Sequence, residues 1–206
     1  MLSAGGPFGY SARFWILAAA TGIGAGVCGG LLMLLLRAVQ HLSWSYSRGT
    51  FLDAIEAAGS QQRIAVLLAA GLLIGAVRWR WQHQPGGHAG ELAEAIWFHC
   101  GRLRPGRTIA RAVLSIIAVG MGASLGREAA PKQTGAVIAA LLANWTKLSS
   151  VEQRLLVACG AGAGMAAVYN VPFGGALFAL EVLLGTLALP LIPAALATSL
   201  IATWVS

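Results

Sequence analysis

Long runs of apolar residues alternate with short polar segments along the whole chain. Residues 14–36 contain no charged side chain. Since about 20 apolar residues let a helix cross a bilayer, this run predicts a membrane span. Residues 64–77 form a second run that is short for a span. Further runs cover 108–125, 136–145, 155–169, 176–184 and 186–205. The pattern predicts an all-α integral membrane protein.

Glycine and proline interrupt several of these runs, at Pro85–Gly87, at 170–175 and at 190–193. Broken helices place their N-terminal N–H groups inside the membrane, where an anion can bind them. Irregular backbone at that depth is tolerated only when protein buries it or when it lines a water-filled cavity. The pattern therefore indicates a transport site, with kinked packing helices as the structural alternative.

The composition agrees with a membrane protein and narrows its partners. The chain is 57% hydrophobic and 10% charged, against about 25% charged in soluble domains. Its net charge of +7 comes from residues that flank apolar runs and form no basic face, so we expect no nucleic-acid partner. The arginines between Arg78 and Arg111 predict a cytoplasmic segment, with the N-terminus on the same side. Cys28 and Cys159 lie in small-residue runs and suit close packing.

Enzymatic and metal-dependent functions find little support in the sequence. There is no nucleotide-binding loop, nucleophile elbow or HExxH motif, so we expect neither an enzyme nor a cofactor. A metal transporter using His83, His88, His99 and Cys100 is an alternative of a different class. No ligand spacing repeats among these residues, and we therefore predict no metal site.

The stretch "GASLGREAAPKQTG", residues 122–135, places charged residues between apolar runs. An ionisable group in a membrane needs a partner or a function. Pro131 suits the first turn of a helix, whose start favours negative charge. Glu128 can occupy an anion site there and act as a gate. It can equally be a capping carboxylate paired with Arg127 or Lys132.

Two spacings add structural detail. Glu128 and Lys132 are four residues apart with the acid first, the favourable order for a helical pair, so Lys132 is a candidate partner of the gate. Small residues at helical spacing permit close helix approach. They are Gly160, Ala163, Gly164 and Ala167.

Two stretches together resemble the CLC family of chloride channels and chloride/proton antiporters. "GASLGREAAPKQ" resembles its Gly-Arg-Glu-Gly-Pro motif. "GAGAGMAAVYNVPFGGALFALEVL", residues 160–183, resembles its Gly/Ala-rich helix, Asn-x-Pro break and "LFxLE" helix. The two stretches follow in the family's order and at a fitting distance. The resemblance extends from about Pro85 to Leu183.

This resemblance implies the N-terminal repeat of an inverted-repeat fold, with tilted, broken and re-entrant helices. It implies a homodimer, with a pathway for chloride or other small anions in each subunit. Glu128 matches the external gating glutamate. Asn170 and Pro172 match the helix break, and Glu181 matches the acidic residue of the next helix. The backbone amides that match the anion-coordinating helix start belong to Gly126, Arg127, Glu128, Ala129 and Ala130.

The sequence also departs from the family pattern. Ala129 and Ala130 replace the Gly-Pro that follows the gate, which predicts an altered helix start. The loop whose serine coordinates the anion appears here as "GGHAGEL", leaving Gly87 or His88 in that role. Val182 takes the place of the antiporters' internal proton-transfer glutamate, as in channel-type members.

We expect residues 1–206 to be one CLC-type transmembrane domain, first half only, with the missing second repeat supplied in cis or in trans. The predicted function is anion transport by a channel or exchanger gated by Glu128, in a bacterial-type inner or plasma membrane. Two alternatives stay open. One is a fluoride- or other-anion-selective relative, and the other is a non-transporting half-protein or membrane scaffold.

Overall fold

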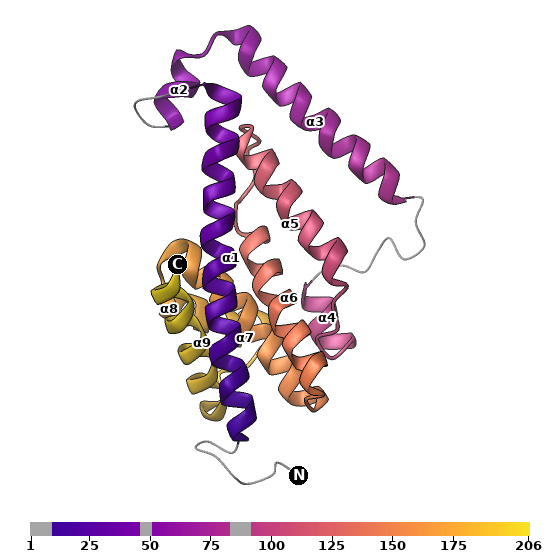
Figure 1. Cartoon of the computed structure of the whole chain (residues 1–206), viewed down its shortest axis with the longest axis vertical. Coiled ribbons are helices and arrows are strands. Elements are labelled where there is room, and N and C mark those ends of the chain that lie inside the picture. Colours follow the sequence, from indigo (N-terminus) through magenta and orange to yellow (C-terminus); the bar gives the residue numbers. More distant parts are fainter. Residues whose placement is uncertain (1–9, 46–50, 83–91) are drawn as a thin grey trace.

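The structure, a computed structural model, describes residues 10–45, 51–82 and 92–206. Helices and loops make up these residues, and no strand occurs among them, as the apolar pattern predicted. Figure 1 shows a bundle crossed along its length by the first helix. The elements are α1 (Ala12–Trp44), α2 (Phe51–Ala57), α3 (Ser60–Gln82), α4 (Leu92–Phe98), α5 (Pro105–Gly120), α6 (Ala129–Thr146), α7 (Ser150–Tyr169), α8 (Pro172–Leu177), the π-helix η2 (Phe178–Leu183), the 3₁₀-helix η3 (Leu189–Leu191) and α9 (Ile192–Val205).

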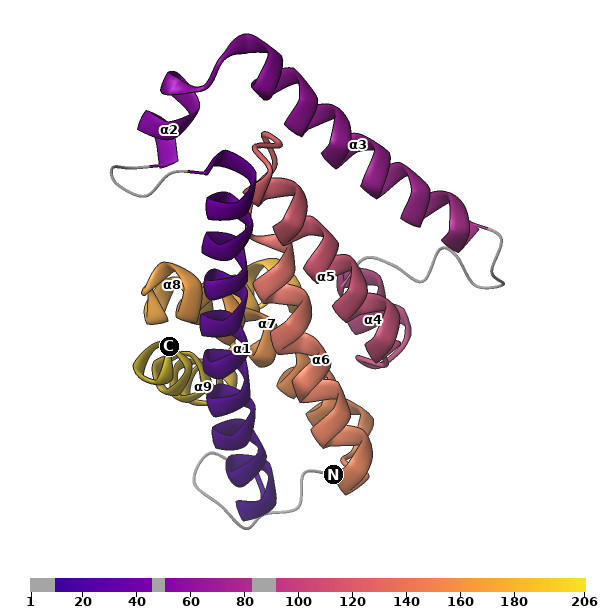
Figure 2. The same cartoon turned by 45° about the horizontal axis from the view of Figure 1, so that its top comes forward.

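In the described part of the chain, two helices are long and apolar enough to cross a membrane, α1 and the stretch Ser60–Arg80 of α3. The apolar run 64–77, expected to be short for a span, lies within a longer helix. The polar residues on both sides continue the helix to 23 residues, because polar side chains at helix ends can lie at the membrane interface. Outside the bundle, α3 runs along the α5 side of the molecule (Figure 2), and its leucines are largely exposed.

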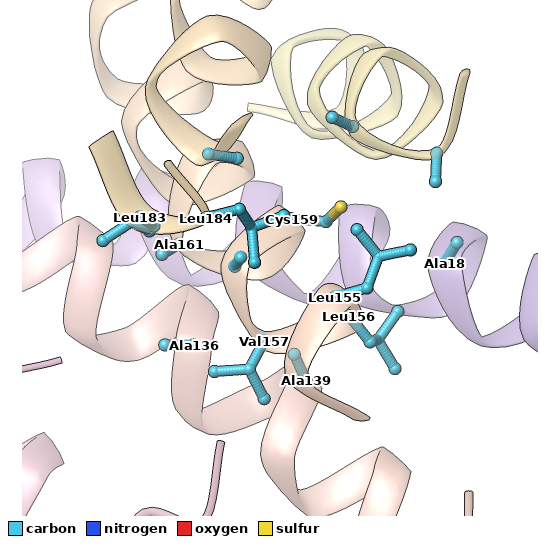
Figure 3. Packing of buried hydrophobic residues seen from close by; sticks show 14 of the residues in the cluster. Ala18, Ala136, Ala139, Leu155, Leu156, Val157, Cys159, Ala161, Leu183 and Leu184 are labelled. Carbon is cyan, nitrogen blue, oxygen red and sulfur yellow. The ribbon is translucent and has the colours of Figure 1, made fainter. Parts of the chain in front are cut away.

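Buried on most sides, α7 lies at the centre of the bundle, with α1, α6, α8 and α9 packed against it. A helix that is apolar all round is typical of such a position. Leu156, Val157 and Cys159 are fully buried. Figure 3 shows them together with side chains from α1, α6 and the end of η2. The packing role predicted for Cys159 is confirmed, whereas Cys28 is only half-buried.

Glycines set the distance between α6 and α7. A Cβ atom on Gly160 would lie 2.5 Å from the Gly135 carbonyl oxygen and 2.8 Å from the Ala139 Cβ. One on Gly164 would collide with the carbonyl oxygen of Pro131. The predicted small-residue contact is therefore confirmed for both glycines. The two alanines of the same stripe pack instead with alanines of α1 and α9.

Helix boundaries differ from the limits of the apolar runs. The run at 108–125 is broken, since α5 ends at Gly120 and Gly122 has a φ of +93°. The short helix expected at 136–145 is the second half of α6, which begins at Ala129. The polar segment between the first two apolar runs contains α2. Apolarity marks what can be buried, while helices extend through any residues that tolerate helical dihedrals.

Candidate functional site

The loop between α5 and α6 carries the central motif, and it begins against the last turn of α1. Trp44 donates a buried hydrogen bond from Nε1 to the carbonyl oxygen of Gly120, at 3.3 Å. Gly122 lies against the same indole, where a Cβ would come within 2.9 Å of Cζ2. A side chain at this position would therefore meet both the indole and an unfavourable φ. The loop is thus fixed at the end of the bundle opposite the N-terminus.

The chain enters α6 through Glu128, which precedes the helix with φ −76° and ψ −31°. The first amides of any helix lack an acceptor within that helix. Ala129 and Ala130 supply two of them, while Pro131, the third helical residue, has no N–H to contribute. Thr134 holds the first turn by donating from its hydroxyl to the Ala130 carbonyl oxygen at 3.0 Å. The positive end of the α6 dipole therefore lies beside Glu128.

The Glu128 carboxylate is held loosely. It makes no capping hydrogen bond to the α6 amides, so of the capping alternative the structure shows only the pairing with Lys132. Its Oε2 lies 3.9 Å from Lys132 Nζ, with 55% of the Glu128 side chain exposed and 25% of the Lys132 side chain. Such a long, exposed pair contributes at most about 1 kcal/mol. The side chain folds back over Gly126, where a Cβ would lie 3.8 Å from the carboxyl carbon.

Both cations of the motif rest on aromatic rings from the second motif. The guanidinium carbon of Arg127 lies 5.1 Å from the centre of the Tyr169 ring. Lys132 Nζ lies 5.3 Å from the centre of the Phe178 ring. Both distances suit a cation–π interaction. Arg127 makes no ion pair with a carboxylate of the described residues. The sequence reasoning missed both aromatic partners.

The second motif forms the predicted helix break. Asn170 ends α7 in the left-handed conformation, with φ 57°. Pro172 is the first residue of α8, where its fixed φ and missing N–H carry no penalty. Glu181 lies exposed on η2, and the neighbouring Val182 is 61% exposed. A π-helical turn is uncommon and frequently accompanies a functional site.

The two motifs, far apart in the sequence, therefore meet at one place through α6, α7 and η2. Residues 66–206 match the model of the voltage gated chloride channel family. The chain belongs to this family. Its members, the CLC proteins, are multi-pass membrane proteins that transport ions.

Curated relatives support the assignment. A "Voltage-gated ClC-type chloride channel ClcB" from Citrobacter koseri is 32% identical over 175 residues, which cover 80% of this chain and 42% of that protein. A protein of the same name from Yersinia pestis is 39% identical over 122 residues, covering 59% of this chain and 29% of that protein. The chain thus spans less than half the length of these relatives.

The fold agrees with a solved CLC structure. "X-ray crystal structure of a slow cyanobacterial Cl-/H+ antiporter" describes a chain that superposes with a TM-score of 0.72 and 22% identity. The alignment covers 95% of this chain and 46% of the antiporter chain. The all-α membrane fold of the CLC type, predicted from the two motifs, is confirmed.

Other candidates of the sequence lie elsewhere in this CLC chain. Gly87 and His88, the possible anion-binding loop, fall outside the described residues, as does His83. His99 and Cys100 are exposed at the end of α4. No group of three metal-ligating side chains occurs within residues 10–45, 51–82 and 92–206, so the described parts of the chain give the metal-transporter alternative no support.

Proposed function

We propose that this chain contributes to a transmembrane chloride pathway and that Glu128 is its gate. The observation that carries the proposal is the loosely held carboxylate at the start of α6, beside helix amides that it does not cap. A carboxylate that swings away from this position would leave a helix start suited to another anion. The amides of Gly126 to Ala130 would then coordinate the incoming ion.

Nearby cations support the same function. Arg127 and Lys132 each bring a positive charge to the motif, and each rests on an aromatic ring. Neither charge is cancelled by a tight ion pair within the described residues. Both therefore add to the positive potential that draws anions toward the site. Chloride is the substrate named for the curated relatives, and we propose it here.

The remaining parts of the proposal concern assembly. The relatives are more than twice as long as the matched region, so a complete pathway in this proposal includes a counterpart of their remaining part, in cis or in trans. The chain would form one half of a single CLC-type domain, in a homodimer in a bacterial inner or plasma membrane. Asn170 and Pro172 would hold the helix break, with Glu181 on the following helix. Gly87 or His88 would supply an inner contact to the anion.

The test is chloride flux in proteoliposomes, using protein that contains this chain together with that counterpart. Glu128→Ala removes the gate, and Glu128→Gln keeps its shape but not its charge. Glu94→Gln serves as the matched control, because Glu94 is an exposed acid on α4. The proposal expects both Glu128 variants to change the rate of flux, whereas the control should match the wild type. Equal flux in all four proteins would refute gating by Glu128.

The same vesicles separate the alternatives. Chloride flux that moves no protons would fit a channel, in line with Val182 at the position of the antiporters' proton-transfer glutamate. Uphill proton movement driven by chloride would instead establish an exchanger with another proton route. Fluoride flux well above chloride flux would identify the other-anion-selective relative. Absence of all anion flux would favour the scaffold.

Lys132 has a separate test as the partner of the gate. Lys132→Met keeps an unbranched side chain of similar length and removes the charge next to Glu128. We expect the anion selectivity, or the dependence of flux on external pH, to change. Lys147→Met is the control, since Lys147 lies beyond the far end of α6. Unchanged selectivity and pH response in Lys132→Met would show that this lysine is only a packing residue.

A further inference from the structure

A basic and aromatic patch lies at the end of the bundle where α1 begins, away from the Glu128 site. We call it the Trp97 patch and define it as Trp97, Phe98, Arg102, Arg104 and Arg154. The turn after α4 packs on the start of α7, since a Cβ on Gly101 would lie 3.4 Å from the Gln153 carbonyl oxygen. In Figure 1, α4 lies just below the lower end of α5, in the half of the molecule that holds the N-terminus of α1, and it contacts α7.

Arg154 is the centre of the Trp97 patch. Its guanidinium carbon lies 4.1 Å from the centre of the Trp97 ring, the closest of the cation–π contacts described for this chain. Its Nε is buried and donates to no acceptor within the described residues. No described carboxylate lies within ion-pair distance of it. Arg154 as a whole is half-buried, and an unused donor on its stacked guanidinium is suited to an anionic group such as a phosphodiester, because two phosphate oxygens can accept hydrogen bonds from the planar guanidinium fork.

The surroundings of Arg154 add charge and apolar surface. Arg102 and Arg104 are both exposed. Helices α4 and α7 carry two acids, fewer than the three cations Arg102, Arg104 and Arg154. Glu94 is exposed on α4, and Glu152 accepts hydrogen bonds from Ser149 in the capping box of α7. Phe98 is 80% exposed and Trp97 is 50% exposed. A soluble ion would make no use of this aromatic surface, whereas a lipid has both a phosphate and an acyl chain.

We propose that the Trp97 patch binds the headgroup of an anionic phospholipid. In this proposal Arg154 donates hydrogen bonds to the phosphate, and Trp97 and Phe98 lie at the membrane interface. The arginine-rich segment is the one that the positive-inside rule assigns to the cytoplasm. Anionic lipids attract basic residues at that surface. Aromatic side chains are favoured at the same depth. The proposal does not depend on anion transport by the chain.

Native mass spectrometry of the delipidated full chain tests the proposal, with phosphatidylglycerol and phosphatidylcholine of identical acyl chains as probes. The wild type should prefer phosphatidylglycerol by more than about tenfold, because three basic residues contribute. Arg154→Lys keeps the charge but loses the planar fork, and should weaken phosphatidylglycerol binding about fivefold. Arg80→Lys, at an exposed position on α3, is the matched control and should bind as the wild type does.

Three results would overturn the proposal. Equal binding of both lipids would show that the Trp97 patch has no headgroup preference. Full binding in Arg154→Lys would mean that charge alone acts, without a built site. Displacement of the lipid by millimolar inorganic phosphate would identify a soluble-anion site instead. If Arg154→Lys fails to fold by circular dichroism, Arg102→Gln and Trp97→Leu take its place, and each should lower phosphatidylglycerol binding while Arg80→Lys does not.

Discussion

Gly164→Ala tests whether the close crossing of α6 and α7 holds the motif around Glu128 in place. The added Cβ would collide with the Pro131 carbonyl oxygen and lie 2.8 Å from its carbonyl carbon. Both are backbone atoms, so no side chain can rotate away and the two helices must separate. Pro131 is in the first turn of α6, directly after the amides beside Glu128. One methyl group therefore perturbs both the core and the start of α6, where the gate is proposed.

The expected cost follows from two opposing effects. Overpacking a core costs up to about 3 kcal/mol of stability. We use this upper value because only backbone atoms can move to relieve the collision. Alanine in place of glycine gains about 1 kcal/mol of helix propensity. The net loss is about 2 kcal/mol, which lowers the Tm of a chain of this size by about 4–8 °C. We expect the helices to separate locally while the bundle still folds.

Thermal melts in detergent, followed by circular dichroism at one scan rate, measure this loss. Gly30→Ala is the matched control, since Gly30 is also inside a helix and a Cβ there meets nothing within 4 Å. The control gains only helix propensity and should melt about 2–4 °C above the wild type. A Gly164→Ala variant that melts within about 1 °C of the wild type, or that follows the control, would refute the crossing argument.

Three further substitutions probe individual contacts by the same melts. Ser149→Ala removes the capping box of α7 and should lower the free energy of unfolding by about 1 kcal/mol. The control Ser150→Ala, one residue inside the helix, should change it little. Equal Tm values for the two variants would show that the cap contributes nothing. Trp44→Phe keeps an aromatic ring but leaves the Gly120 carbonyl without its hydrogen-bond donor, which should lower the free energy of unfolding by about 1–3 kcal/mol. An unchanged Tm would mean that a water molecule replaces the indole N–H. Asn170→Val places a branched residue at φ 57° and should lower the free energy of unfolding by about 1–2 kcal/mol, whereas Asn170→Gly should be tolerated. Similar losses of stability in both variants would show that the amide side chain matters instead.

Features with a local physical cause could be predicted from the sequence. An uncharged run long enough to cross a bilayer gave the span of α1. Asn170 tolerates the left-handed conformation and Pro172 cannot continue a helix, so the break between α7 and α8 followed from residue types alone. The glycines of α7 indicated a close helix contact. In each case the types of the residues themselves restrict the backbone conformation or the surroundings that the segment can have.

Helix limits were less predictable because apolarity and helicity are different properties. The apolar run at 136–145 covers only part of α6, because the first helical residues include the polar Lys132 and Gln133. Pro131 was the better signal, since it lies in the first turn of α6 as its residue type predicted. In α3 the polar flanks concealed a helix long enough to cross a membrane. Alanine, lysine and glutamine all favour helix, and none of them makes a run look like a membrane segment.

The partners of the two cations could not be derived from local spacing. Spacing alone pairs Lys132 with Glu128, one turn earlier on the same helix. The structure gives Lys132 a second neighbour, Phe178, and places Arg127 on Tyr169. Tyr169 is the last residue of α7 and Phe178 is the first residue of η2, so their distances from the cations depend on how closely α6 crosses α7. Glycine at that crossing brings the rings within reach of the cations. Because each cation is partly engaged by a ring, Glu128 lies near positive charge without a tight ion pair, and the gate proposed at Glu128 needs that balance.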